Sequence, residues 1–80
     1  MPKLKVLSGE DIIKELELHG FAILRQKGSH VRLSRFTIDQ KQNVTIPNHA
    51  ELDRGTIKSI IRTLVPFLDQ NSIDKIFYKN

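Results

Sequence analysis

The stretch FAILRQKGSHVRLS, from Phe21 to Ser34, predicts a β-hairpin, and the other elements of the fold can be placed around it. Residues 21–26 alternate with a period of two, which is typical of a half-buried strand and puts Ile23 and Arg25 on one face. A tight Gly-Ser turn follows at residues 28–29. In the next strand Val31 and Leu33 face one way, and the other face carries His30, Arg32 and Ser34.

A helical pattern precedes the hairpin, and a third strand follows it. Ser8, with acids in the turn after it, predicts a helix from Gly9 to His19 that Gly20 closes in a left-handed conformation. The polar residues 37–43 indicate a longer connection. The apolar alternation of residues 44–46 then predicts a short strand that stops at Pro47.

Two further helices are expected in the last third of the chain. The first starts between residues 53 and 56 and ends before Pro66, with an apolar stripe formed by Ile57, Ile60, Ile61 and Leu64. Ser72 is expected to cap a last, short helix. The order helix, strand, strand, strand, helix predicts an α+β fold. Both helices then cover one face of a three-stranded antiparallel sheet, and a short C-terminal helix follows.

Composition narrows the function classes. With 80 residues the chain fits one domain, residues 1–80, with a core at 8–65 and a C-terminal extension at 66–80. Thirteen Lys and Arg against nine Asp and Glu give a formal charge of +4, which favours an anionic partner, nucleic acid first. Without cysteine, and without zinc-finger spacing of its histidines, the chain is expected to bind no metal and no cofactor. No signal peptide or membrane segment is apparent, so we expect a cytoplasmic protein.

The predicted topology places His30 in a basic environment. In a meander the start of the second strand lies beside the end of the third, so His30 is expected near Pro47, Asn48 and His49. The start of the next helix, with its free amides, is expected to form an anion site beside it. The residues expected to contact RNA are Lys27, Gly28, Ser29, Arg32, Arg54 and Thr56.

An imidazole beside a phosphate-sized cationic pocket suits RNA cleavage. Histidine can take the proton of a ribose 2′-hydroxyl or give one to the leaving 5′-oxygen, while cations stabilise the charge on the transition state. A passive phosphate contact is the competing interpretation of His30. The second acid or base stays open between His49, a basic side chain and water, and His49 equally suits a loop that only fixes the chain's turn.

Three segments in order, Gly28-Ser29-His30, residues 44–49 (VTIPNH) and residues 55–57 (GTI), resemble the HicA toxins, the mRNA interferases of HicA/HicB toxin-antitoxin modules. The resemblance implies a double-stranded-RNA-binding-domain-like fold and metal-independent cleavage of mRNA, which arrests translation. It also implies neutralisation by a HicB antitoxin, and it matches His30 to the family's catalytic histidine.

The chain departs from the family at one position of the site. Many members carry a second histidine directly after the catalytic one, where this chain has Val31, so either the second histidine is dispensable or activity is altered. Two other functions remain open: a non-catalytic RNA-binding module of the same fold, and a protein-interaction role alone. Intact RNA after salt-sensitive binding would identify the first, and antitoxin binding without RNA affinity the second.

Overall fold

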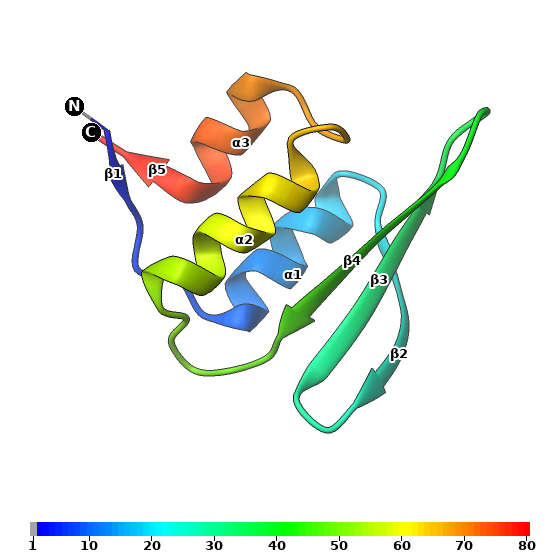
Figure 1. The fold of residues 1–80 in the computed structure, drawn as a ribbon, viewed down its shortest axis with the longest axis horizontal. Coiled ribbons are helices and arrows are strands. Elements are labelled where there is room, and N and C mark those ends of the chain that lie inside the picture. The colour runs from blue at the N-terminus through cyan, green and yellow to red at the C-terminus, as the bar shows by residue number, and fades with distance from the viewer. Residues whose placement is uncertain (1) are drawn as a thin grey trace.

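The structure, a computed structural model, describes residues 2–80 and has the predicted α+β architecture (Figure 1). A three-stranded antiparallel sheet of order β2-β3-β4 packs against helices on one side, and a second, two-stranded sheet joins β1 to β5 near the chain ends. The elements are β1 (Lys3–Leu4), α1 (Gly9–Leu18), β2 (Ala22–Lys27), β3 (His30–Phe36), β4 (Lys41–Pro47), α2 (Arg54–Leu64), α3 (Gln70–Phe77) and β5 (Tyr78–Lys79).

Side-chain caps define where the helices begin. Ser8 and Asp11 form a reciprocal capping box at the start of α1, and Gly20 closes the turn after α1 with a φ of 91°. The helix itself ends at Leu18, one residue before the predicted end. The prediction that Ser72 caps α3 is wrong. Asp69 is the N-cap, and its carboxylate accepts a hydrogen bond of 2.8 Å from the Ser72 backbone amide.

The predicted long connection at residues 37–43 is also wrong. A compact turn spans residues 37–40, closed by the Thr37 amide on the Gln40 carbonyl at 2.8 Å, and β4 already starts at Lys41. The polar residues 42 and 43 fit inside the strand because each has a side-chain partner on β3. Gln42 Oε1 accepts from Arg35 Nε at 2.8 Å, and Asn43 Oδ1 accepts from the Ser34 hydroxyl at 2.5 Å.

Strand β2 departs most from expectation. It was predicted to be half-buried, but every residue from Ala22 to Lys27 is exposed. Strand β2 is one of the two outer strands of the sheet, and unlike β4, the other one, it holds no buried residue. Its register also shifts. Ile23 pairs with Leu33 and Arg25 pairs with Arg32, so Leu24 is an extra residue in a β-bulge. Ile23 and Arg25 therefore lie on opposite faces, contrary to the predicted alternation.

The core lies between the sheet and the helices, and α3 contributes to it. One buried apolar cluster includes residues of α1, β3, β4 and α2 together with Ile73, Ile76 and Phe77 of α3. The C-terminal segment therefore packs on the rest of this chain, and the β1–β5 ladder pairs Leu4 with Tyr78. Within residues 2–80 there is no helix with the length and apolar character to cross a membrane.

Arg35 links the end of the sheet to the helical layer. Its guanidinium donates to the carbonyl oxygens of His19, at 2.9 Å, and Phe67, at 2.6 Å, and it lies over the Phe21 ring, 4.9 Å from the centroid. These contacts join α1, β3 and the connection between α2 and α3. Arg35 thus faces away from the surface that carries His30 and has a structural role.

Candidate functional site

The face of the sheet opposite the helices carries a cationic pocket near the hairpin turn. Its volume is about 300 Å³, and its lining residues are Arg25, Lys27, His30, Arg32 and Thr45. These residues lie in two adjacent rows across the strands. One row contains Lys27 and His30, with Pro47 as the β4 partner of His30, and the other contains Arg25, Arg32 and Thr45. His30 is exposed within the pocket, so the imidazole is accessible to a large substrate.

The β-bulge at Leu24 creates this grouping. Ile23 shares a face with the fully buried Leu33, and without the extra residue Arg25 and Lys27 would follow it onto the helical side. The bulge reverses the alternation, so both cations join Arg32 and His30 on the open face. Sequence reasoning therefore missed Arg25 as a pocket residue, since nothing in the composition of β2 marks the bulge.

The pocket is electropositive because three cationic residues and no acidic residue line it. No Asp or Glu occurs between Phe21 and Ile38. Within the described residues, the one ion pair joins Lys14 to Glu10 along α1, at 3.3 Å. Arg25, Lys27 and Arg32 therefore form no ion pair with a carboxylate of the described residues, which suits a polyanionic ligand. Thr45 adds a hydroxyl to the pocket lining, because it pairs directly with Arg32 in the sheet.

The turn that precedes His30 is stabilised by hydrogen bonds within the hairpin and from the loop after β4. Gly28 has a φ of 59°, a conformation that favours glycine, and its carbonyl accepts the Gln26 side-chain amide at 3.0 Å. The Ser29 carbonyl accepts the backbone amide of Asn48 at 2.6 Å. The Ser29 hydroxyl lies 3.1 Å from Nε2 of His49, so His49 contacts the turn and does not line the pocket.

The loop at residues 47–49 rests in turn on the start of α1. The Gly9 amide donates to the His49 carbonyl at 2.9 Å, and Gly9 is buried against this loop. A Cβ at position 9 would lie 2.6 Å from the Asn48 Cα and 2.9 Å from the Pro47 carbonyl carbon. Only glycine allows this approach, so a contact chain runs from Gly9 through Asn48 to Ser29 and the adjacent His30. Sequence reasoning missed Gly9, which looked like an ordinary first helical residue.

The structure does not bring Arg54 and Thr56 into this pocket. Arg54 lines a different cavity, of about 490 Å³, together with Leu4, Lys5 and Val6. The Thr56 amide donates to the carboxylate of the N-cap Asp53 at 2.7 Å, and this hydrogen bond lowers the pKa of Asp53. A carboxylate thus already occupies the helix start that was expected to attract phosphate.

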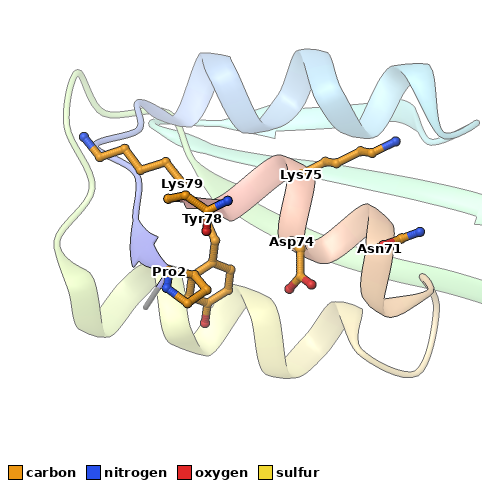
Figure 2. Close-up of a pocket in the computed structure, with 7 residues that line it drawn as sticks. Pro2, Asn71, Asp74, Lys75, Tyr78 and Lys79 are labelled. Atoms are coloured by element: carbon orange, nitrogen blue, oxygen red, sulfur yellow. The ribbon is translucent and has the colours of Figure 1, made fainter.

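A third cavity, of about 330 Å³, lies beside α3 and the chain ends (Figure 2). Asp74, Lys75 and Lys79 are among its lining residues, but Figure 2 shows them pointing in different directions. Asp74 is also occupied, because its Oδ1 accepts the Gln70 side-chain amide at 2.8 Å. The cavity lacks a convergent set of polar groups, so the pocket around His30 is the better candidate site.

Residues 9–64 match the family model described as HicA toxin of bacterial toxin-antitoxin. The chain belongs to the HicA toxin family. The match extends from the first residue of α1 to the last residue of α2 and includes every residue that lines the His30 pocket. The protein is therefore a toxin of a toxin-antitoxin module, and membership implies an antitoxin partner. No curated protein and no solved structure matches the chain.

Proposed function

We propose that this HicA toxin is a metal-independent endoribonuclease that cleaves mRNA through His30 and so arrests translation. The observation that carries the proposal is the exposed imidazole in a pocket with three cations and no carboxylate. Arg25, Lys27 and Arg32 are the proposed phosphate contacts in the pocket. Gly28 and Ser29 shape the turn, and His49 is the proposed auxiliary residue.

The proposed reaction uses the RNA's own nucleophile. The ribose 2′-oxygen attacks the adjacent phosphorus, and the bond from phosphorus to the 5′-oxygen breaks. The products are a 2′,3′-cyclic phosphate and a 5′-hydroxyl. His30 moves one of the two protons, either from the 2′-hydroxyl or to the 5′-oxygen. The neighbouring guanidinium groups stabilise the additional negative charge that develops on the phosphate oxygens.

His49 supports this reaction by positioning. Its ring contacts the Ser29 hydroxyl, and Ser29 precedes His30 directly, so His49 acts on the backbone that carries the imidazole. Arg54 and Thr56 lie outside the pocket, at the start of α2. Any contact that they make with RNA therefore involves nucleotides next to the one bound in the pocket. The proposed neutralising partner is a HicB-type antitoxin that covers His30 and the cations around it.

The test compares histidine variants on one long RNA. Purified wild type, His30→Ala, His49→Ala and His19→Ala are incubated with the RNA in excess chelator, and the 3′ ends of the fragments are analysed. His19 is the matched control, because its Nδ1 contacts the Glu15 carbonyl at 2.9 Å within α1 and the residue does not line the pocket. Circular dichroism confirms that each variant is folded.

We expect wild type and His19→Ala to give fragments that end in cyclic phosphate, and His30→Ala to give none. His49→Ala is expected to cleave more slowly without a change in the product ends. Full activity of folded His30→Ala would refute the catalytic assignment. If wild type binds RNA in a salt-sensitive manner but leaves it intact, the non-catalytic RNA-binding function replaces the proposed one.

A further inference from the structure

Strand β2 forms an open edge of the main sheet. It pairs with β3 on one side, and none of its residues pairs with another strand on the other. All six of its residues are exposed, whereas β3 and β4 each hold several buried residues. Figure 1 shows the β2–β3 turn extending beyond the helices, so they do not cover this end of the strand. Such an edge presents unpaired backbone groups to which another strand can pair.

The edge has two chemically different halves. Ile23 and Leu24 are 49% and 48% exposed, and with Ala22 they form an apolar half. Arg25 and Lys27 form a cationic half that continues directly into the His30 pocket. The nearest acids in the sequence, Glu17 and Asp39, lie outside β2 and β3, so the cationic half has no counter-charge on its own hairpin.

We propose that this edge binds an extended segment of the antitoxin by strand addition. The segment pairs with the backbone of β2. Its apolar side chains cover Ile23 and Leu24, and its acidic side chains lie beside Arg25 and Lys27. Backbone pairing supplies affinity, and the apolar and acidic pattern supplies specificity. The inference rests on the proposed neutralisation by an antitoxin, but it does not depend on the chemistry of His30.

Charge argues for an acidic partner over a second copy of the toxin. Pairing two β2 edges would bring Arg25, Lys27 and Arg32 of both copies together, on chains that each carry a formal charge of +4. Charged side chains on an edge are a known means of preventing self-association, and a bulge increases the local twist, which limits long, flat pairing. An acidic segment of a few residues satisfies both constraints.

The first experiment measures backbone hydrogen exchange. Folded His30→Ala toxin is used, so that toxicity does not limit expression, alone and in complex with the cognate antitoxin. We expect peptides that cover residues 22–27 to exchange at least tenfold more slowly in the complex. Unchanged exchange of these peptides in a stable complex would overturn the inference alone. An antitoxin that does not bind the toxin would overturn the proposed neutralisation and this inference together.

Substitutions then test the apolar half of the edge. Leu24→Asp, at the bulge residue, is expected to weaken antitoxin binding at least tenfold, since it puts a charge among apolar contacts and opposite an acidic partner. Val65→Asp is the matched control. Val65 is 52% exposed at the end of α2, and we expect no change in antitoxin affinity. Equal affinities of the two variants would contradict the proposal.

Two further measurements would show whether the β2 edge binds something other than the antitoxin. Sedimentation of the toxin alone over a range of concentrations should show a monomer. A dimer that Leu24→Asp dissolves would instead assign the edge to a second copy. Slower exchange of residues 22–27 with RNA, but not with the antitoxin, would assign it to the substrate. Either result would overturn the proposal.

Discussion

Replacing Gly9 with alanine tests whether the start of α1 positions the turn that precedes His30, the proposed catalytic residue. The added Cβ would lie 2.6 Å from the Asn48 Cα, and two non-bonded carbon atoms prefer a separation of about 3.5 Å or more. The loop at residues 47–49 must therefore move by about 1 Å. Because the Asn48 amide donates to the Ser29 carbonyl, this movement is transmitted to the residue next to His30.

The expected magnitudes follow from that displacement. Overpacking of a buried contact destabilises a protein by about 1–3 kcal/mol, and the better helix propensity of alanine offsets up to about 1 kcal/mol. The net range is about 0–3 kcal/mol, and we expect Gly9→Ala to lower the free energy of unfolding by a value near its middle, about 1–2 kcal/mol. A displacement of about 1 Å at a catalytic group can reduce the rate by about 100-fold, so cleavage by the folded variant should fall by one to two orders of magnitude.

Gly55→Ala is the matched control. Gly55 lies in the first turn of α2, and the atom nearest to a Cβ there is Asp53 Oδ1 at 3.5 Å, an ordinary contact. Alanine should stabilise this helix by about 0.5–1 kcal/mol and leave RNA cleavage unchanged. Urea denaturation gives the unfolding free energies, and fragment yield per folded molecule gives the rates.

Two results would contradict the expectation for Gly9→Ala. If this variant is as stable as Gly55→Ala, α1 does not approach the loop closely enough for a Cβ to displace it. If Gly9→Ala is destabilised but the folded protein cleaves RNA at the wild-type rate, the loop packs on α1 without positioning the turn. Only a combined loss of stability and rate supports the contact chain from Gly9 to His30.

Three further predictions follow from other contacts. Arg35→Gln should lower the unfolding free energy by about 2–4 kcal/mol, measured by urea denaturation, because it leaves the carbonyls of His19 and Phe67 without their donor; RNA affinity of the folded protein should not change. Arg32→Gln should reduce the slope of log affinity against log salt concentration for single-stranded RNA by about 0.7, the value for one lost phosphate contact, while Arg62→Gln on α2 should not change it. The pKa values of Asp53 and Asp69 are lowered by hydrogen bonds, from the Thr56 amide and from the Ser72 side chain and amide respectively. The folded state therefore binds fewer protons than the unfolded one, so the stability that these caps supply is complete above about pH 5 and is lost as the pH falls through the lowered pKa values. The double variant Asp53→Asn and Asp69→Asn, which keeps the caps but cannot titrate, should show a smaller loss of stability in acid denaturation.

Local signals in the sequence were sufficient to predict where α1 and α2 begin and where the hairpin turns. Ser8 and Asp53 cap their helices through side chains that bond to the next turn, and Gly28 adopts the positive φ that its turn requires. Each of these contacts spans at most a few residues. The order of elements then fixed the meander, and with it the pairing of His30 with Pro47.

Features that depend on distant partners were not predictable in this way. Gln42 looked like a loop residue because its burial depends on Arg35, a partner seven positions away on β3. Strand β2 was predicted to be half-buried because apolar residues begin its alternating pattern. It lies at an edge of the sheet instead, and a bulge reverses the faces that its residues occupy. The same bulge adds Arg25 to the pocket, so the error in the strand and the omission in the site have one cause.

The register of β3 with β4 also explains why position 31 can hold valine. Val31 pairs with Ile46 and is 2% exposed, whereas His30 pairs with Pro47 on the open face. Adjacent residues in a strand face opposite sides, so a histidine at position 31 would point into the core and could not share the pocket without breaking the β3–β4 ladder. Valine at this position adds buried apolar area to the strand that carries His30 and removes nothing from the pocket. The pocket therefore holds one histidine, His30, and its positive charge comes from Arg25, Lys27 and Arg32.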